Sequence, residues 1–320
     1  MGKQWTVYVT RMIPQEVLDE LAQHCEVEVN PENRPLTKAE LLEKVRGRDA
    51  VLTQAGDIVD DAVLAAAGPQ CKIFANYAVG YNNFDLTAAA RHNVMLSNTP
   101  DVVTDSTVEM AWTLLFAVAR RLIEADAYVR AGKFKGLDPM LLLGTGLTGK
   151  TLGVIGAGRI GSKFAQKGRA FDMKIIYNDV APNARFEKET GAAYVDKDTL
   201  LAQADFLSLH VPLLPATRHL IGARELKLMK KTAILINSSR GPVVNETDLV
   251  QALKDGEIRG AGLDVFENEP ALAPGLSDLP NVVLAPHLGT ATHETRLGMG
   301  RVALTNILAA LRGETPPNKL

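Results

Sequence analysis

The sequence is short of cysteine and of net charge, and both shortages exclude kinds of protein. Only Cys25 and Cys71 occur among 320 residues, and neither belongs to a CxxC motif or to a Cys/His cluster. We therefore expect a protein of the reducing cytosol without a bound metal. The 35 Lys and Arg residues nearly balance the 37 Asp and Glu residues, which leaves a net charge of −2. This balance argues against a nucleic-acid partner and against an anionic membrane.

Long hydrophobic runs are also missing. The longest, residues 110–119, is far shorter than a membrane span and is followed by Arg120 and Arg121. Residues 1–6 lack the apolar core of a secretory signal. We expect a cytoplasmic protein that does not bind membranes. Its hydrophobic content of 46% and charged content of 22% are typical of a globular chain, and its length suits two domains.

A glycine motif stands near the middle of the chain. Gly156-Ala157-Gly158-Arg159-Ile160-Gly161 directly follows a short apolar run, residues 151–155, and precedes an amphipathic stretch, residues 162–171. A strand, a GxGxxG turn and a helix in this order are typical of the start of a dinucleotide-binding domain. Gly156 permits the tight turn, Gly158 lets backbone approach a pyrophosphate, and Gly161 lets helix and sheet pack closely. The helix N-terminus supplies N–H donors for the phosphates.

The residue after the next apolar run indicates which dinucleotide binds. Residues 173–178 lead into Asp179, which lies 18 residues after Gly161, close to the spacing of about 20 expected for a ribose-binding carboxylate. This match argues against a glycine turn of an unrelated α/β protein. A carboxylate accepts hydrogen bonds from a ribose 2′-hydroxyl and repels a 2′-phosphate, so we expect NAD(H) rather than NADP(H). Arg185 could reach such a phosphate, but we interpret it as a solvated residue of the next helix.

Apolar runs alternate with helix-like stretches along most of the chain, which predicts an α/β fold with parallel sheets covered by helices. Residues 101–130 are expected to form one long helix, with Asp101 or Thr104 as its N-cap, and residues 132–150 a glycine-punctuated arm. The predicted strands are residues 6–10, 50–53, 72–77, 94–97, 151–155, 174–178, 205–210, 233–237, 262–266 and 282–285.

The order of these segments predicts two domains. Because the glycine motif comes near the middle, an independent α/β unit precedes the nucleotide-binding one. The last helical stretch, residues 292–311, has no strand of the nucleotide-binding domain left to serve, so we expect it to return to the first unit. We therefore predict two Rossmann-like or flavodoxin-like domains, with residues 99–287 inserted into a domain of residues 1–98 plus 288–320.

Three polar residues follow strands of the nucleotide-binding domain. Arg240 comes after residues 233–237, Glu269 after residues 262–266, and His287 after residues 282–285. Ligands of open α/β sheets bind beyond the carboxyl ends of the strands. Taken singly, Arg240 and Glu269 could be surface charges and His287 a hydrogen-bonded structural histidine. An arginine, a carboxylate and a histidine after successive strands are more simply explained as one site.

With these residues in place, the chain resembles the D-isomer-specific 2-hydroxyacid dehydrogenase family over essentially its whole length. Within it, the nearest likeness is to glyoxylate reductases that also accept hydroxypyruvate. Those reductases often carry a tryptophan in the arm, whereas residues 138–143 are aliphatic here. This difference would reshape the substrate pocket and with it the choice of substrate. The matching motifs, in order, are NYAVGYNN (76–83), NTPDV (98–102), GKTLG (149–153), SRG (239–241), DVF (264–266) and Pro286-His287.

The resemblance implies roles for the polar residues. Arg240 would hold the carboxylate and carbonyl oxygen of a 2-keto acid and polarise the carbonyl. His287 would donate the proton as hydride arrives from the nicotinamide, and Glu269 would bond its other nitrogen, fixing the tautomer and favouring imidazolium. Backbone N–H groups of Val79 and Gly80 would bind the substrate carboxylate, so the first domain would be the substrate domain.

The same resemblance implies which residues surround the cofactor. Arg159 and Ile160 would meet the pyrophosphate, with Thr107 and Asp264 near the nicotinamide. For Asp264 the alternative is a carboxylate that only satisfies local backbone. The remaining histidines, His24, His92, His219 and His293, match no catalytic position and are interpreted as surface or packing residues. The predicted cofactor site comprises Thr107, Gly156, Gly158, Arg159, Ile160, Gly161, Asp179, His210, Val211, Pro212, Thr217 and Asp264.

We therefore predict an NAD-dependent enzyme that reduces a small 2-keto acid, preferably glyoxylate or hydroxypyruvate, to the D-2-hydroxy acid. By resemblance it would be a homodimer in which residues 101–150 embrace the partner. One alternative is an NAD-sensing, corepressor-like binding protein that keeps the same fold. Another is a different dehydrogenase of the family, such as a phosphoglycerate dehydrogenase; a formate dehydrogenase would require glutamine where Glu269 stands.

Overall fold

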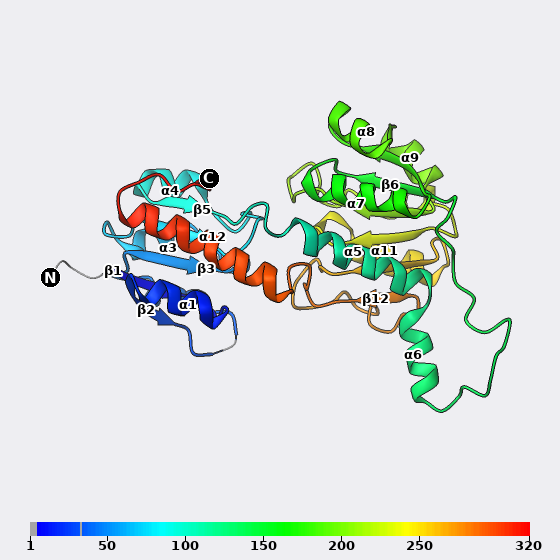
Figure 1. Ribbon diagram of the computed structural model, residues 1–320, viewed down its shortest axis with the longest axis horizontal. Coiled ribbons are helices and arrows are strands. Elements are labelled where there is room, and N and C mark those ends of the chain that lie inside the picture. Colours follow the sequence, from blue (N-terminus) through cyan, green and yellow to red (C-terminus); the bar gives the residue numbers. More distant parts are fainter. Residues whose placement is uncertain (1–4, 33) are drawn as a thin grey trace. The chain divides into compact units, whose positions relative to one another are not determined.

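The computed structural model describes residues 5–32 and 34–320, which form two compact units (Figure 1). The first unit comprises Met1–Val103 and Ala291–Leu320, and the second, Thr104–Thr290, is inserted into it. Each unit contains one sheet whose strands are all parallel, which confirms the predicted α/β class with two parallel-sheet domains. Residues 1–4, on which the expectation about a secretory signal partly rests, lie outside the described residues.

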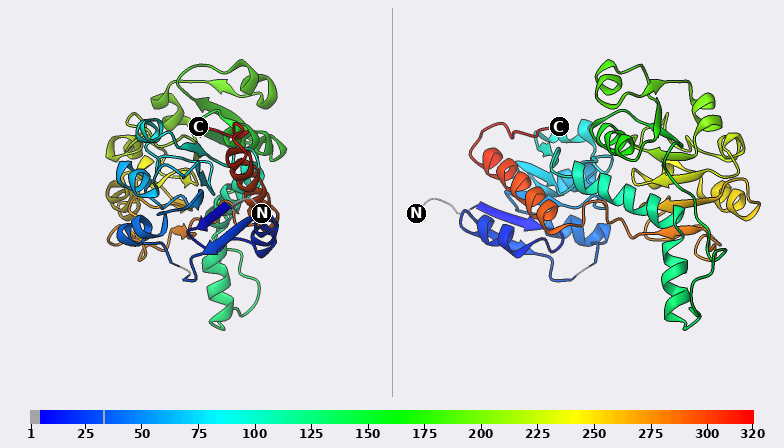
Figure 2. Two further views of the ribbon diagram at one scale, coloured as in Figure 1. Left: turned by 90° about the vertical axis from the view of Figure 1, so that its left-hand side faces the viewer. Right: turned by 45° about the vertical axis from the view of Figure 1, so that its right-hand side comes forward.

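The first unit is a five-stranded sheet in the order β2-β1-β3-β4-β5, with helices on both faces. The C-terminal helix α12 packs against α1 on one face (Figure 2). Gly300 permits this contact, because a Cβ at Gly300 would lie 2.4 Å from a methyl of Val17. The elements are β1 (Trp5–Val9), α1 (Gln15–Ala22), β2 (Cys25–Val29), α2 (Lys38–Lys44), β3 (Ala50–Thr53), α3 (Asp61–Ala67), β4 (Ile73–Asn76), α4 (Leu86–His92), β5 (Met95–Ser97) and α12 (His293–Leu311).

The last residues of the chain complete this sheet. Lys319 forms an antiparallel bridge with Ser97, and Leu320 N–H donates to the carbonyl of Leu96 at 2.9 Å. The C-terminus therefore covers the edge that β5 would otherwise expose. The opposite edge is β2, a strand that the sequence prediction missed. Its residues alternate between apolar and acidic side chains and are mostly half-exposed, so they form no continuous apolar run.

The second unit is a seven-stranded sheet in the order β12-β11-β10-β9-β6-β7-β8. The order reverses between β6 and β9, and in such folds ligands bind beyond the carboxyl ends of the strands at this reversal. Its elements are α5 (Thr104–Ala119), α6 (Leu122–Arg130), β6 (Thr151–Ile155), α7 (Arg159–Ala170), β7 (Lys174–Asn178), α8 (Ala184–Thr190), β8 (Ala193–Tyr194), α9 (Lys197–Gln203), β9 (Phe206–Leu209), α10 (Ala223–Leu228), β10 (Ile234–Asn237), the 3-10 turn η1 (Gly241–Val243), α11 (Glu246–Lys254), β11 (Gly260–Leu263) and β12 (Val282–Leu284).

The single long helix expected over residues 101–130 is wrong. The chain forms α5 and α6 instead, and Arg121 between them adopts a left-handed backbone with φ 53°. The guanidinium of Arg121 pairs with Glu124 in the first turn of α6. The carbonyl of Ala119 at the end of α5 accepts the N–H of Thr145, so the returning arm replaces the continuing helix as its partner.

The apolar stretch of α5 is core. Trp112, Leu114 and Leu115 are buried against β6 and α7, and α5 and α7 lie side by side on one face of the sheet (Figure 1). Two further expectations need correction. The two-residue edge strand β8 was missed because both of its residues are exposed, and β11 ends at Leu263, so Asp264 lies just beyond the strand rather than inside it. None of the helices in the described part of the chain could cross a membrane.

Candidate active site

The glycine motif forms the turn from β6 into α7. Gly156 has φ 99°, and a Cβ there would lie 2.6 Å from the carbonyl oxygen of His210. A Cβ on Gly161 would lie 1.9 Å from the carbonyl oxygen of Gly156, so helix and turn touch through backbone alone. Gly158, the N-cap of α7, faces open space, and no described side chain caps the helix there. The N-terminal N–H groups of α7 can therefore receive an anion.

Asp179 lies directly after β7 and reaches this turn. One carboxylate oxygen accepts the N–H of Ala157 and the other the N–H of Val180, both at 2.7 Å. The carboxylate thus stands beside the glycine turn, where a ribose hydroxyl would meet it. The open face of Gly158 and this acid fit the pyrophosphate and ribose of a nicotinamide dinucleotide. Arg185 is exposed on α8 and pairs with Glu189 at 2.7 Å, in agreement with its interpretation as a solvated residue.

His210 directly follows the neighbouring strand β9 and borders the same turn. Its ring packs on Phe164 of α7, with centroids 4.9 Å apart, and its Nε2 lies 2.9 Å from the hydroxyl of Ser208. Burial lowers the pKa of His210 to about 3, so the ring is neutral at pH 7. A Cβ on Gly156 would also lie 3.1 Å from a methyl of Val211. Thr217 donates to the carbonyl of Pro212 at 2.6 Å and closes the loop that follows.

Arg240 stands three residues beyond β10 on a tightly packed turn. The side-chain amide of Asn237 donates to the Arg240 carbonyl at 3.0 Å. A Cβ on the next residue, Gly241, would lie 1.8 Å from the carbonyl oxygen of Phe266, so this position requires glycine. The guanidinium donates to the Ser239 carbonyl at 2.6 Å. Burial lowers the pKa of Arg240 and the charge of Glu269 opposes that effect; an arginine remains cationic in either case.

Glu269 and His287 form an ion pair. Nδ1 of His287 lies 2.9 Å from one carboxylate oxygen of Glu269, and the other oxygen accepts the N–H of Phe266 at 3.0 Å. Burial alone would raise the pKa of Glu269, but the hydrogen bond and charge of His287, the Phe266 N–H and Arg240 together hold it below its usual value. Because the carboxylate occupies Nδ1, Nε2 is the nitrogen that can exchange a proton with a ligand.

The backbone of His287 is left-handed, with φ 55°, and Asp264 holds it. The carbonyl of Asp264 accepts the His287 N–H at 2.9 Å, and its carboxylate accepts the N–H groups of Leu288 at 2.6 Å and Gly289 at 2.7 Å. Burial is the main cause that raises the pKa of Asp264. Asp264 therefore satisfies the local backbone around His287. The side chain of Thr107, on α5, lies beside Gly289.

Val79 and Gly80 belong to the first unit, whereas every other predicted site residue belongs to the second. They follow β4, and buried asparagines hold both of their carbonyls. Asn98 donates to the Val79 carbonyl at 2.8 Å and Asn76 to the Gly80 carbonyl at 2.7 Å. These bonds fix the orientation of the peptide groups in this loop.

Sequence reasoning missed His219, Glu246 and Glu267, which lie on or beside the segment that carries Glu269. His219, interpreted from the sequence as a surface or packing residue, pairs its Nε2 with Glu267 at 2.6 Å. Glu246, at the start of α11, is 3% exposed and accepts backbone N–H groups of that segment. These partners are 21 to 48 residues apart in sequence, and no local pattern indicates them. His92 and His293 do pair at the surface of the first unit, with Asp61 and Glu16.

Comparison with known proteins identifies the family. The family model for the NAD binding domain of D-isomer specific 2-hydroxyacid dehydrogenases matches residues 112–289. A glyoxylate reductase of Thermococcus litoralis is 50% identical over 98% of this chain and 95% of its own length. A solved protein of Thermus thermophilus has a TM-score of 0.93 and 42% identity, covering 98% of this chain and 99% of that one.

A second solved structure is that of an NADPH-dependent glyoxylate/hydroxypyruvate reductase of Sinorhizobium meliloti in complex with NADP and malonate. It has a TM-score of 0.87 and 31% identity, and the match covers 99% of this chain and 97% of that one. The chain therefore binds a nicotinamide dinucleotide. The chain belongs to the family of D-isomer specific 2-hydroxyacid dehydrogenases.

Proposed function

We propose that this chain uses NADH to reduce a small 2-keto acid, glyoxylate or hydroxypyruvate, to the D-2-hydroxy acid. The observation that carries the proposal is the set Arg240, Glu269 and His287, which follow the neighbouring strands β10, β11 and β12 of the NAD-binding unit. Curated relatives named glyoxylate reductase, 44% to 50% identical to this chain, support the substrate class.

Each of the three residues has a distinct task in this reaction. Arg240 binds the substrate by its planar guanidinium, which grips carboxylate and carbonyl oxygens and draws electron density from the carbonyl. The bound cofactor supplies the hydride to the carbonyl carbon. Nε2 of His287 gives its proton to the carbonyl oxygen, which completes the hydroxyl group. Glu269 holds Nδ1–H and stabilises the imidazolium from which that proton comes.

We also propose a role for the loop that follows β4 in the first unit. Backbone N–H groups of Val79 and Gly80 bind the substrate carboxylate. The proposal is supported by two bonds that already orient these donors. Thr99 N–H donates to the Ala78 carbonyl, in the peptide that carries Val79 N–H, and Asn98 donates to the Val79 carbonyl, in the peptide that carries Gly80 N–H. Donors that need no reorganisation bind an anion best.

For the cofactor, we propose a preference for NADH over NADPH. Asp179 accepts two backbone N–H groups at the glycine turn and would repel a 2′-phosphate. The Sinorhizobium meliloti relative is NADPH-dependent, so this preference would distinguish the two proteins. Around the remaining parts of the cofactor we propose Thr107, Gly156, Gly158, Arg159, Ile160, Gly161, His210, Val211, Pro212, Thr217 and Asp264.

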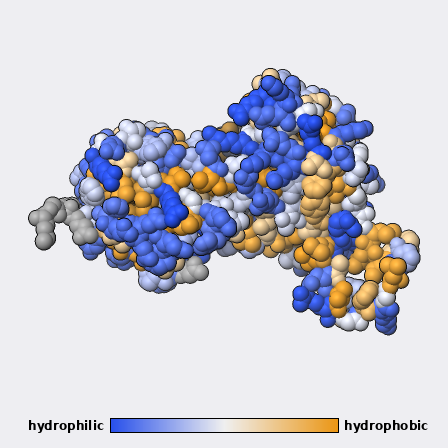
Figure 3. Space-filling model, in the orientation of Figure 1, coloured by the Kyte–Doolittle hydropathy of each residue, from blue (hydrophilic) through white to orange (hydrophobic). Residues whose placement is uncertain are grey.

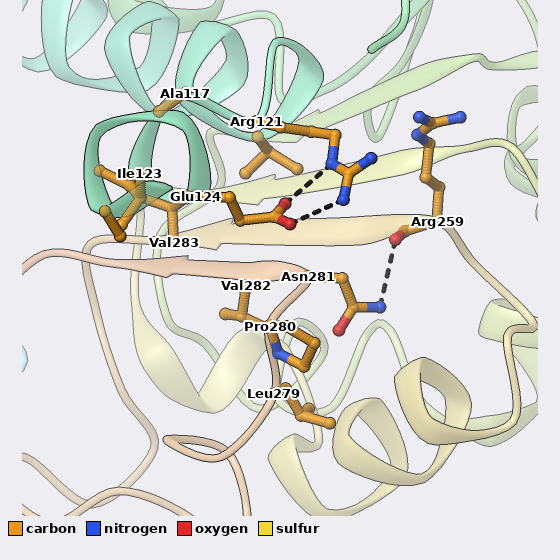
Figure 4. Close-up of a pocket in the computed structure, with 12 residues that line it drawn as sticks. Ala117, Arg121, Ile123, Glu124, Arg259, Leu279, Pro280, Asn281, Val282 and Val283 are labelled. Carbon is orange, nitrogen blue, oxygen red and sulfur yellow. Dashed lines mark hydrogen bonds and ion pairs between the residues drawn. The ribbon is translucent and has the colours of Figure 1, made fainter. Parts of the chain in front are cut away.

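We further propose a homodimer in which residues 101–150 contact the partner. α6 and the arm expose apolar side chains, including Ile123, Phe134 and Leu137, with 57%, 58% and 96% of their surface accessible (Figure 3). A cavity lies between the Arg121–Glu124 pair of α6 and the edge strand β12 (Figure 4). An edge strand beside exposed apolar residues is typical of a protein interface. Sedimentation velocity tests this, and a Leu137→Asp variant should shift the chain toward monomer.

A cytoplasmic location is proposed on the state of the two cysteines. Cys25 and Cys71 are unpaired and buried. Burial raises the pKa of Cys25 to about 11 and that of Cys71 to about 12, so both thiols stay protonated at neutral pH. Unpaired thiols are typical of proteins in a reducing compartment.

The decisive experiment is steady-state NADH oxidation with glyoxylate, hydroxypyruvate, 3-phosphohydroxypyruvate and larger 2-keto acids. The proposal expects the highest kcat/KM with glyoxylate or hydroxypyruvate, and a D-configured hydroxy acid from hydroxypyruvate. A preference for the phosphorylated acid would assign a phosphoglycerate dehydrogenase. Tight NADH binding without turnover of any acid would assign an NAD-sensing binding protein.

A further inference from the structure

The segment between β11 and β12 carries Glu269, and the structure shows what holds that segment in place. Building on the proposed function, we propose that Glu246 is a positioning residue for the reaction: it fixes the segment from Phe266 to Ala273 and thereby keeps Glu269 against His287. Glu246 itself touches neither the substrate nor the cofactor in this proposal.

The two backbone N–H groups that Glu246 accepts lie on either side of Glu269 in the sequence. Glu246 is the first residue of α11 and is 3% exposed. One carboxylate oxygen accepts the N–H of Glu267 at 2.5 Å, two residues before Glu269. The other accepts the N–H of Ala273 at 3.3 Å, four residues after it. The backbone N–H of Glu246 donates in return to the Glu267 carboxylate at 3.3 Å. One buried carboxylate thus ties both sides of the segment to a helix of the unit.

The rest of the segment depends on these ties. Glu269 accepts the N–H of Phe266, so three backbone donors of the segment are satisfied by two carboxylates. The carbonyl of Phe266 lies against Gly241, next to Arg240. The segment is therefore held between the Arg240 turn and α11. Without Glu246, the N–H groups of Glu267 and Ala273 lose their acceptor at a part-buried site, and the segment loses both of these ties to α11.

Glu246 serves the segment as an acceptor rather than as a charge. Burial raises the pKa of Glu246, and the nearby carboxylates of Glu267 and Glu269 raise it further, while the two backbone N–H groups lower it. Among these groups, His219 pairs with Glu267 and His287 with Glu269. A neutral side chain with one good acceptor should therefore retain part of the function. Glutamine at this position keeps an oxygen for the short bond to Glu267 N–H and turns its amide NH2 toward Ala273 N–H, whereas alanine keeps no acceptor.

The test compares Glu246→Ala with Glu246→Gln. In Glu246→Ala, kcat should fall by roughly 10- to 100-fold, as for a misplaced catalytic group. The reduction rate should fall at alkaline pH, where His287 no longer carries the proton that it donates, and in Glu246→Ala this fall should begin at lower pH than in wild type. The same change is expected in Glu269→Gln, which also weakens the pairing with His287. NADH affinity, measured by fluorescence, should stay unchanged. Glu246→Gln should fall between wild type and Glu246→Ala, because it keeps one of the two bonds. The double variant Glu246→Ala/Glu269→Gln should have its alkaline limb at the same pH as Glu269→Gln alone.

Asp205→Ala is the matched structural control. Asp205 also accepts a backbone N–H, that of Thr151 at 2.9 Å, but it lies at the amino end of β9, the end of the sheet opposite the site. It should lower the melting temperature without moving the pH limb. If Glu246→Ala behaves like Asp205→Ala, the positioning role is wrong. Hydrogen exchange in residues 266–273 gives a readout that needs no activity: exchange there should rise in Glu246→Ala, and unchanged exchange would overturn the inference by itself.

The proposed function and the role proposed for Glu246 would be overturned by different results. A wild-type chain that oxidises NADH with no 2-keto acid would overturn the proposed function. A normal wild type with a shifted Glu269→Gln and an unshifted Glu246→Ala would overturn only the role of Glu246.

Discussion

Replacing Glu269 by glutamine removes the charge beside His287 and keeps one of the two acceptor oxygens. With the amide oxygen on Nδ1–H, tautomer and ring orientation are retained, while the amide NH2 faces Phe266 N–H and that bond is lost. For His287 itself, what is lost is the attraction between carboxylate and imidazolium. Protonation of the ring then requires a lower pH, so the alkaline limb of kcat/KM for reduction should move downward. At a pH below that limb, kcat/KM should approach the wild-type value.

The structure bounds the size of this shift. Unit charges 2.9 Å apart attract by roughly 6 kcal/mol at an effective dielectric constant of about 20. The side chains of His287 and Glu269 are 44% and 37% exposed, however, so solvent screens the pair. A charge-assisted hydrogen bond at such a site contributes about 1–2 kcal/mol. At a fixed pH on that limb, this energy corresponds to roughly 5- to 30-fold in kcat/KM.

The assay is the pH dependence of NADH oxidation with saturating cofactor, measured beside thermal melts. His287→Asn provides the companion variant, because asparagine tolerates the left-handed backbone at this position better than alanine does. It should remove the limb and lower kcat by roughly 10²–10⁴. An unshifted profile in Glu269→Gln, or full activity in His287→Asn, would refute the acid–base roles.

Three other changes probe separate parts of the site. Arg240→Lys should raise KM and lower kcat together, because a lysine ammonium cannot grip two oxygens in one plane; near-normal steady-state kinetics would remove Arg240 from the site. Asp179→Ala should abolish the preference for NADH, so that kcat/KM becomes similar for NADH and NADPH. Equal kcat/KM values for the two cofactors in the wild type would contradict the role of Asp179. Burial lowers the pKa of His210 to about 3, so the unfolded chain takes up a proton first as pH falls below about 6.5. Relative to His210→Gln, the wild type should lose about 1 kcal/mol of unfolding free energy between pH 7 and 5.5 in urea titrations, and parallel curves would show that His210 is not held neutral.

The cofactor turn could be predicted because its determinants are local. Gly156, Gly161 and Asp179 follow from backbone clearance and the spacing of one βαβ unit, and the structure places the acid on the turn. Arg240, Glu269 and His287 were found because parallel strands present their carboxyl ends at one edge. The pairing of His287 with Glu269 at 2.9 Å is the contact that the family pattern implies.

Other features depend on contacts that no local pattern reveals. The helix breaks at Arg121, where the carbonyl of Ala119 accepts the N–H of Thr145 from the arm. Thr145 comes more than twenty residues later in the sequence. The edge strands β2 and β8 are half-exposed or exposed, so their sequences lack the continuous apolar run of buried strands. Glu246 was invisible for a related reason: an acid at a helix start is ordinary, and only the folded chain brings the Phe266–Ala273 segment to it.

The bridge between Lys319 and Ser97 has a consequence for synthesis of the chain. The second unit is contiguous, so all of its strands have left the ribosome once Thr290 has emerged. The first unit is still incomplete at that point, because the helix that packs on β4 and the residues that cover β5 follow the second unit in the chain. Domains generally fold as units during synthesis, so the inserted unit can fold first while the surrounding one stays incomplete. A chain that stops short would keep its nucleotide-binding unit and lack a finished first unit, which leaves an open sheet edge that quality-control proteases and chaperones can recognise.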